Sequence, residues 1–240
     1  MNIEHVPDEG ALIERTAELF ATAMRQAVQD RGRFLVALSG GSTPKPAYER
    51  LAQPPYGVSL PWDSASIYFG DERMVPCDSD ESNYKMACES LLNHIDIPAW
   101  NLHRIHGEDS VSEAARLYDV DLRALAEETG ETIPRFDLML LGLGPDGHTA
   151  SLFPGTEVLE NTRDLAAGVR LPDTSEGAQH ATERVTMTYP VLNASRLILF
   201  AVAGADKAEA LSRVEAGDIS APATRVRPTD GDLLWLVCNT

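Results

Sequence analysis

A histidine and an aspartate lie two residues apart in a glycine-rich turn of the sequence. Asp146 and His148 belong to the segment GLGPDGH, residues 142–148, which follows an apolar run starting at Phe136. A carboxylate beside an imidazole orients the ring and stabilises its protonated form, which is the arrangement of a general base. The alternative is an ordinary surface histidine, and the surrounding glycines favour the catalytic interpretation.

A second glycine-rich turn has the composition of a phosphate-binding loop. Residues 39–44, SGGSTP, lie between the apolar run Phe34–Leu38 and a helical pattern over Lys45–Leu51. Glycines let the backbone approach a ligand closely, and hydroxyls together with N–H groups at the start of a helix bind anions. The residues predicted to bind are Gly40, Gly41, Ser42 and Thr43.

The same turn allows two other interpretations. Thr43 can cap the following helix with Pro44 at its first position, which makes the turn purely structural. Ser39, placed between strand and helix with a glycine two residues later, also suggests a nucleophile elbow. That motif has a glycine two residues before its serine, and this sequence has Ala37 there.

Charged residues follow or begin other predicted elements. A third turn begins at Gly70, after the apolar run 65–69, and contains Asp71, Glu72 and Arg73. An arginine there can bind an anionic oxygen, while the acids take up sugar hydroxyls or fix the arginine. Arg184 opens a predicted strand, and Lys207 lies in the first turn of a predicted helix. Each of these charges alone is typical of a solvated surface, so their meaning depends on whether the fold brings them together.

Two further patterns indicate a cofactor or a metal only weakly. Residues 142–147 satisfy GxGxxG after a strand, which is the dinucleotide-binding pattern. Pro154 follows Gly147 by seven residues and leaves little room for the helix that would hold a pyrophosphate. His103 and His106 have i, i+3 spacing, but no other ligands lie near them in the sequence. We expect no cofactor and no metal.

The glycine-rich turns belong to a pattern of apolar strands alternating with helices. This alternation predicts an α/β fold with a mainly parallel, doubly wound sheet flanked by helices. Ligands of such sheets bind beyond the carboxyl ends of the strands, where all three turns fall. Residues 171–183, with Pro172 and Gly177, predict a surface loop. The expected strands are 34–38, 65–69, 136–141, 184–188, 197–202 and 233–237, and the expected helices are 9–30, 45–51, 83–93, 110–128 and 206–216.

Length and charge limit the domain organisation and the partners. The 240 residues suit one domain spanning residues 1–240. Lys and Arg number 20 against 37 Asp and Glu, a net charge of −17 that argues against nucleic acid and anionic membranes. Three cysteines without a CxxC pair, an acidic amino terminus and short apolar runs predict a cytoplasmic protein. A small anionic substrate then requires a pocket that concentrates cations.

Taken together, these segments resemble the 6-phosphogluconolactonase family of the glucosamine/galactosamine-6-phosphate isomerase superfamily. The resemblance runs through residues 38–44, 69–73, 82–84, 142–154, 184–188 and 203–207 in the order of that family. It implies a fold like that of glucosamine-6-phosphate deaminase and ribose-5-phosphate isomerase. It also implies metal-independent hydrolysis of 6-phospho-D-glucono-1,5-lactone to 6-phosphogluconate in the oxidative pentose phosphate pathway.

The resemblance also assigns roles to the candidate residues. His148, oriented by Asp146, is the base that activates water, and Arg73 is the third catalytic residue. The implied partner is the sugar-phosphate lactone, with functional coupling to glucose-6-phosphate dehydrogenase, the preceding enzyme. The implied substrate-binding residues are Gly40, Gly41, Ser42, Thr43, Asp71, Glu72, Arg184 and Lys207.

Two other functions remain open. Glucosamine-6-phosphate deaminase shares the phosphate loop and a GxDGH turn, and Asp71 resembles its enolising base. That deaminase has a catalytic glutamate five residues after the histidine, whereas this sequence has Phe153. A sugar-phosphate-binding regulator that has lost the reaction is the second alternative, against which Asp146, His148 and Arg73 argue.

Overall fold

A six-stranded parallel sheet forms the centre of the computed structural model, which describes residues 1–171 and 182–238. The strand order is β1-β9-β8-β5-β2-β3, and every neighbouring pair is parallel. Strands β2 and β5 are buried along their whole length, as continuous apolar runs between two helical layers should be. The strands are β1 (Asn2–His5), β2 (Phe34–Leu38), β3 (Ala65–Phe69), β5 (Leu138–Leu141), β8 (Leu197–Ala203) and β9 (Asp232–Cys238).

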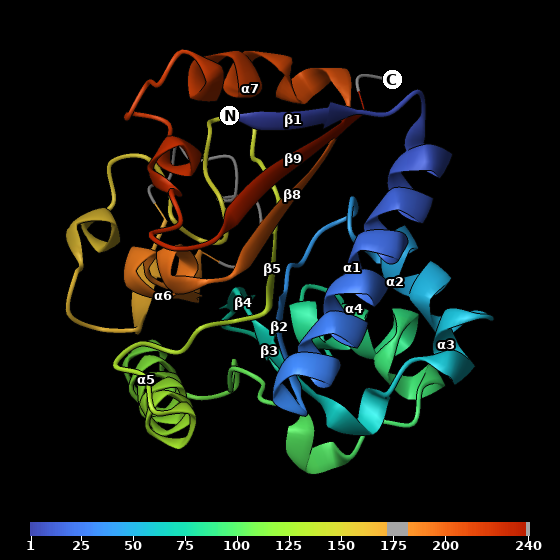
Figure 1. Ribbon diagram of the computed structural model, residues 1–240. Coiled ribbons are helices and arrows are strands. Elements are labelled where there is room, and N and C mark those ends of the chain that lie inside the picture. The colour runs from blue at the N-terminus through green and yellow to red at the C-terminus, as the bar shows by residue number, and fades with distance from the viewer. Residues whose placement is uncertain (172–181, 239–240) are drawn as a thin grey trace.

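Helices cover both faces of this sheet. In Figure 1, α1 and α2 lie on one side of the sheet, and α5 and α6 lie on the other. The predicted α/β fold with a mainly parallel, doubly wound sheet is confirmed. The α-helices are α1 (Glu9–Arg31), α2 (Lys45–Ala52), α3 (Tyr56–Ser59), α4 (Asn83–Ser90), α5 (Val111–Thr129), α6 (Tyr189–Ala194) and α7 (Ala208–Glu215). Short 3-10 helices are Trp62–Ser64, Leu92–His94, Ala99–Asn101, Glu157–Glu160, Ala205–Lys207 and Pro222–Arg225.

The two longest helices begin and end where local chemistry dictates. The Asp8 carboxylate accepts a hydrogen bond from the Ala11 N–H at the start of α1, and Gly32 ends that helix with a φ of 71°. Helix α5 follows the same rule, because Ser110 caps its first turn and Gly130 ends it with a φ of 73°. Side-chain oxygen caps and left-handed glycines satisfy the unpaired backbone groups at helix ends.

A second, antiparallel sheet of three strands was not expected from the sequence. It consists of β4 (Asp71–Arg73), β7 (Glu183–Met187) and β6 (Ala166–Arg170), in the order β4-β7-β6. Gly70 joins the two sheets, since its N–H donates to Leu38 O at 2.9 Å and its carbonyl accepts from Met187 N at 2.8 Å. The predicted strand 184–188 therefore exists, but it pairs outside the parallel sheet.

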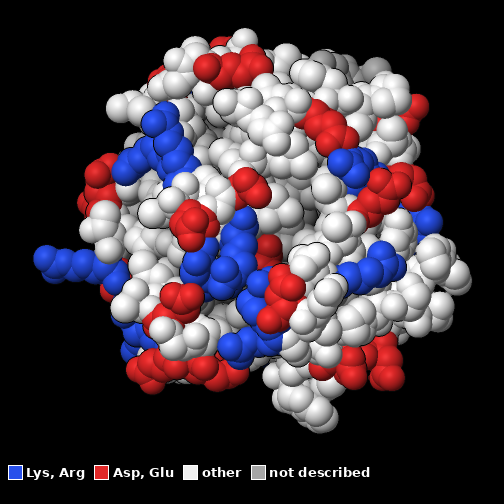
Figure 2. Space-filling model, viewed as in Figure 1, with Lys and Arg blue, Asp and Glu red and all other residues white. Residues whose placement is uncertain are grey.

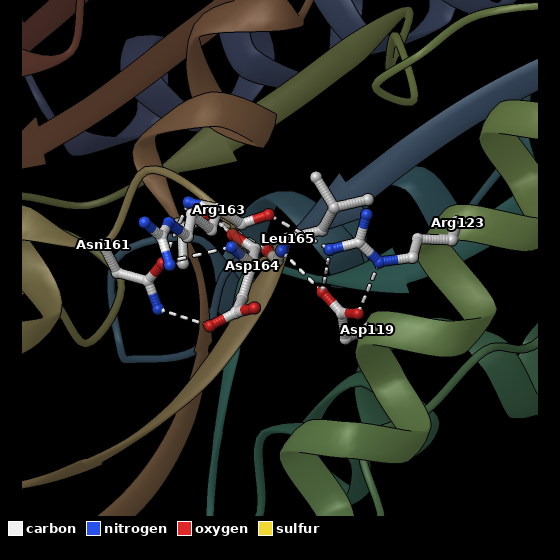
Figure 3. Close-up of polar contacts among 7 residues, drawn as sticks. Asp119, Arg123, Asn161, Arg163, Asp164 and Leu165 are labelled. Atoms are coloured by element: carbon white, nitrogen blue, oxygen red, sulfur yellow. Dashed lines mark hydrogen bonds and ion pairs between the residues drawn. The ribbon is translucent and has the colours of Figure 1, made fainter.

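Helix α5 anchors the segment that leads into β6. Asp119 accepts a hydrogen bond from Leu165 N at 2.6 Å and pairs with Arg123, one helical turn further along α5 (Figure 3). Arg123 also donates to the carbonyl of Arg163 at 3.1 Å, and Asn161 accepts from the N–H of Arg163. These contacts hold the small sheet against α5 and so fix the position of β7.

Charges of both signs share the molecular surface. On the face seen in Figure 2, Lys and Arg side chains gather near the middle and Asp and Glu side chains surround them.

Across residues 1–171 and 182–238, no helix is both long and apolar enough to cross a membrane. Most of the predicted surface loop 171–183 lies outside the described residues.

Two buried tyrosines hold the ends of neighbouring strands. The Tyr48 hydroxyl of α2 accepts from Ser39 N at 3.0 Å and donates to Ser39 O at 2.9 Å. The Tyr118 hydroxyl of α5 makes the same pair of bonds to Phe69, at 2.9 and 2.8 Å. Burial raises the pKa of both phenols above the usual value, so each stays a neutral donor and acceptor.

Replacing Tyr48 with phenylalanine should lower the free energy of unfolding by about 1–3 kcal/mol. The change removes one hydroxyl and leaves both backbone groups of Ser39 without their partner. Urea unfolding measures the loss. Tyr56→Phe is the matched control, because its hydroxyl has no hydrogen bond within the described ranges. Equal stability of the two variants would contradict the prediction.

Candidate active site

One cavity lies where β2, β3 and β5 end. It has a volume of about 410 Å³ and is bordered by the loop after β2, by strand β4 and by the turn after β5. This is the carboxyl edge of the parallel sheet, where the sequence places its three turns. The predicted site residues that line the cavity are Gly40, Gly41, Ser42, Thr43, Asp71, Arg73, His148, Arg184 and Lys207.

His148 and Asp146 form a hydrogen-bonded pair beside this cavity. Asp146 Oδ1 lies 2.6 Å from His148 Nδ1 and also accepts from the His148 N–H at 2.9 Å. Burial raises the pKa of Asp146, but the hydrogen bond and charge of His148 outweigh it and hold that pKa below its usual value. An ionised Asp146 keeps the proton on Nδ1, so Nε2 is the nitrogen that can accept a proton.

Glycines make this turn possible. Gly147 has a φ of 88°, and its carbonyl accepts from Ala223 N at 2.9 Å. A Cβ on Gly144 would lie 2.1 Å from Cε1 and Nδ1 of His148, so only glycine lets the imidazole occupy its position. Turns rather than an α-helix follow Gly147, and the helix required by a dinucleotide site is missing from residues 148–156.

The SGGSTP loop presents backbone and hydroxyl groups to the cavity. Gly41 has a φ of 99°, which a residue with a side chain rarely adopts. Pro44 occupies the N-cap position of helix α2, and no side-chain hydrogen bond caps this helix. The interpretation of Thr43 as its cap is therefore wrong. Thr43 lines the cavity together with Ser42. The loop therefore has the chemistry of an anion site.

Ser39 lacks the surroundings of a nucleophile. Its hydroxyl donates to the carbonyl of Gly40 at 3.2 Å, and among the described residues it contacts neither a histidine nor a carboxylate. A serine nucleophile needs an adjacent base.

We therefore expect a serine-directed sulfonyl fluoride to leave Ser39 unlabelled and any catalysis at this site unchanged. Mass spectrometry of the treated protein and its residual activity measure this, and Ser39→Ala should retain activity within about 3-fold because no covalent step passes through the hydroxyl. Labelling of Ser39 with loss of turnover would support the interpretation of Ser39 as the serine of a nucleophile elbow.

Asn83 is a site residue that the candidate set omitted. Its amide donates to the Asp71 carbonyl at 2.9 Å and to Asp71 Oδ1 at 3.3 Å, and its oxygen accepts from Arg73 at 2.8 Å. A Cβ on Gly40 would lie 1.9 Å from Asn83 Oδ1, so the loop 39–44 packs directly on this side chain. Two signals in the sequence could have found it, because a predicted helix begins at Asn83 and residues 82–84 belong to the family resemblance.

Asp71 and two arginines share the small sheet. The register of β4 and β7 sets Arg73 opposite Arg184 and Asp71 opposite Thr186. Both arginines line the cavity, so this register brings two cations to one wall of it. Asp71 is 6% exposed and accepts from Ser151 Oγ at 2.5 Å.

Arg184 is the most buried of the cavity cations, with 4% of its surface exposed. Burial lowers the pKa of Arg184, the charge of Asp71 raises it, and the charge of Arg73 lowers it. An arginine remains protonated after such a shift. Lys207 lines the same cavity and pairs with Asp206 at 2.8 Å. The acidic chain thus concentrates three cations at one site, as a small anionic substrate requires.

Glu72 was predicted to bind substrate, but it is not among the residues that line the cavity. Its carboxylate accepts from the N–H groups of Arg73, Asn83 and Tyr84 and from Ser82 Oγ, at 2.7–3.0 Å. Burial raises the pKa of Glu72, and these four bonds offset only part of the rise. The carboxylate serves the start of α4, where unpaired N–H groups need an acceptor.

The two histidines with i, i+3 spacing lie apart from this site. His103 stacks on Tyr68 with ring centroids 4.1 Å apart and contacts Asp121 at 3.0 Å. His106 lies 3.8 Å from Asp109. In the part of the chain that the structure describes, no three His, Cys, Asp or Glu side chains gather as a metal site would require.

Fold and site together define an α/β protein with a histidine–aspartate pair and three cations at a cavity on the carboxyl edge of its sheet, which is where ligands of such folds bind. Comparisons with known proteins identify its family. A family model described as glucosamine-6-phosphate isomerases/6-phosphogluconolactonase matches residues 7–235. The chain belongs to this family.

Individual relatives cover almost the whole chain. A protein of a Nostoc species named 6-phosphogluconolactonase is 41% identical over 239 residues, which span 98% of this chain and 94% of that protein. The crystal structure of 6-phosphogluconolactonase from Thermotoga maritima matches with a TM-score of 0.84 and 30% identity, covering 99% of each chain. A monomeric glucosamine-6-phosphate deaminase, 22% identical with a TM-score of 0.81 and 99% and 97% coverage, shares the fold.

Proposed function

We propose that this chain hydrolyses 6-phospho-D-glucono-1,5-lactone to 6-phospho-D-gluconate in the oxidative pentose phosphate pathway. The observation that carries the proposal is the 2.6 Å contact of His148 Nδ1 with Asp146, in a cavity that also contains Arg73, Arg184 and Lys207. A lactone carrying a phosphate needs both parts: a base for the ester and cations for the phosphate. Relatives with this name match the chain from end to end.

The reaction follows from the free imidazole nitrogen. Nε2 of His148 removes a proton from a water molecule, whose oxygen forms a bond to the lactone carbonyl carbon and leaves a tetrahedral oxyanion. The bond from that carbon to the ring oxygen then breaks, and the imidazolium returns its proton to the departing oxygen. Asp146 stabilises the imidazolium between these steps.

The cavity divides between the two ends of the substrate. Gly41, Ser42, Thr43, Arg184 and Lys207 hold the phosphate, since hydroxyls, backbone N–H groups and cations bind such an anion. Asp71 and Arg73 take the carbonyl and hydroxyl end, where Arg73 faces the developing oxyanion. A lactone is an activated ester, so one base, fixed donors and positioning supply enough catalysis without a metal or a covalent intermediate.

The decisive test is a coupled assay. Purified protein is mixed with freshly generated 6-phosphogluconolactone in the presence of a chelator, and 6-phosphogluconate is followed through NADP reduction by its dehydrogenase. We expect production well above the spontaneous rate, unchanged when the chelator is left out. Production at the spontaneous rate alone would reject the proposal, and release of ammonia from glucosamine 6-phosphate would then identify the deaminase.

We also place the enzyme in the cytoplasm, next to glucose-6-phosphate dehydrogenase, which supplies the lactone. Such functional coupling predicts that adding this protein to a glucose-6-phosphate dehydrogenase reaction keeps the lactone from accumulating. Accumulation of the lactone at the same level with and without the protein would contradict the coupling.

A further inference from the structure

The imidazole of His148 is held by more than its aspartate. The ring of Phe153 stacks on it, with centroids 4.0 Å apart and an angle of 22° between the planes. Gly144 borders the imidazole so closely that a methyl group there would overlap Cε1 and Nδ1. Phe153 is 1% exposed and lines the cavity. The imidazole is therefore in close contact with both an aromatic face and a glycine backbone.

The same phenyl ring also contacts the most buried cation of the site. The guanidinium carbon of Arg184 lies 5.7 Å from the centroid of Phe153, within the range of a cation–π contact. One rigid ring thus touches both the base and a residue that we assign to the phosphate. The distance between these two groups depends on where that ring lies.

The segment that carries Phe153 is fastened to the small sheet. Ser151 Oγ donates to Asp71 at 2.5 Å, and Ser151 N donates to Thr186 Oγ1 at 3.2 Å. Ala150, in the same turn, has a φ of 47°, which is a strained conformation for a residue with a Cβ. Strain of this kind persists only where the surrounding contacts enforce the conformation. The turn therefore places Phe153 in a fixed position relative to β4 and β7.

We propose that Phe153 is a positioning residue for the reaction, which holds the His148 imidazole so that Nε2 faces the cavity at a set distance from Arg184. The inference rests on the proposed lactone hydrolysis. Nε2 must face first the attacking water and then the departing ring oxygen, and a misplacement of about 1 Å can cost about 100-fold in rate. An aliphatic side chain fills the space but offers no flat face, so the imidazole gains freedom to rotate.

The test compares Phe153→Leu with a matched control, Phe200→Leu. Phe200 is equally buried and stacks on Trp235 with centroids 3.8 Å apart, but it lies on β8 outside the cavity lining. We expect Phe153→Leu to lower kcat about 10- to 100-fold with KM within about 3-fold, and Phe200→Leu to leave both within about 3-fold while it lowers stability. Equal kcat in the two variants would overturn the proposal.

A second readout needs no substrate. NMR relaxation of the His148 ring should show a rigid imidazole in the unmodified protein and in Phe200→Leu, and increased ring motion in Phe153→Leu, because Phe153 is the aromatic face stacked on that ring. An equally rigid ring in Phe153→Leu would overturn the proposal even if the unmodified chain did not hydrolyse the lactone, so the two failures are distinguishable. Phe153→Met repeats both measurements if the leucine variant does not fold.

Discussion

Replacing His148 with glutamine should lower kcat for lactone hydrolysis by about 10²–10⁴-fold, with KM changed only a few-fold. The glutamine amide preserves a polar side chain of similar reach but cannot accept the proton of the attacking water. Binding is expected to survive because the loop 39–44, Arg184 and Lys207 hold the phosphate in our assignment. Steady-state kinetics in the coupled assay separate the two effects, since the loss of an interaction made only in the transition state lowers kcat and kcat/KM equally and leaves KM unchanged.

The chain offers a matched control for this variant. His103 is also a histidine paired through Nδ1 with an aspartate, Asp121 at 3.0 Å, yet it lies outside the catalytic cavity. His103→Gln should keep kcat within about 2-fold, so a loss specific to position 148 assigns the base. Near-normal turnover in His148→Gln would remove His148 from the mechanism and turn attention to Asp71 as the remaining candidate base.

The inner strands of the central sheet could be predicted because they are short apolar runs, whereas β1, with the sequence NIEH, is not such a run and was not predicted. The segments Phe34–Leu38 and Ala65–Phe69 are observed with the predicted bounds. Phe34–Leu38 is apolar and buried at every position, as a strand covered on both faces should be, while Ala65–Phe69 forms the edge of the sheet and includes the half-buried Ser66. The glycine turns after β2 and β5 were recognisable for a related reason. A chain that changes abruptly from strand to turn at the carboxyl edge needs residues without a Cβ, and the rule that ligands bind there supplies the location of the site.

The small sheet and its consequences could not be predicted in the same way. Strand β4 has three residues, too few for any periodicity, and its pairing with β7 joins segments more than 100 residues apart in the chain. That pairing decides that Arg73 faces Arg184. From the local sequence, each arginine is predicted to be an isolated surface charge. The register of β4 with β7 depends on contacts between segments far apart in the chain, which local sequence does not contain.

The neighbouring carboxylates of Asp71 and Glu72 have different roles, and the reason is visible only in the fold. Asp71 and Glu72 alternate along β4, so one side chain faces the cavity and the other faces the start of α4. Glu72 is used by backbone N–H groups of that helix, whereas Asp71 remains at the cavity with Asn83 and Ser151 as its partners. The sequence predicted that both acids lie beside the substrate. Because side chains alternate along a strand, only Asp71 lines the cavity, and Glu72 has a structural role at the start of α4.

Replacing Arg184 with alanine should raise KM for the phosphorylated lactone by about 100-fold, with a much smaller effect on kcat. Hydrogen bonds to charged groups contribute about 1.5–3 kcal/mol, and the low exposure of this guanidinium, 4%, places the upper end of that range in reach. At about 1.4 kcal/mol per tenfold, roughly 3 kcal/mol corresponds to the 100-fold change. Product inhibition by 6-phosphogluconate should weaken in parallel, because the product carries the same phosphate.

Two further variants distinguish charge from geometry at this position. Arg184→Lys retains a cation but loses the planar fork, so KM should rise about 10-fold rather than 100-fold. Arg225→Ala removes an arginine that stacks on Tyr189 and pairs with Glu160 outside the cavity lining, and its KM should match that of the unmodified enzyme. If Arg184→Ala instead lowered kcat with KM unchanged, the guanidinium would act on the oxyanion. Arg73 would then take the phosphate, because these two arginines face each other across β4 and β7 and either can serve either end of the substrate.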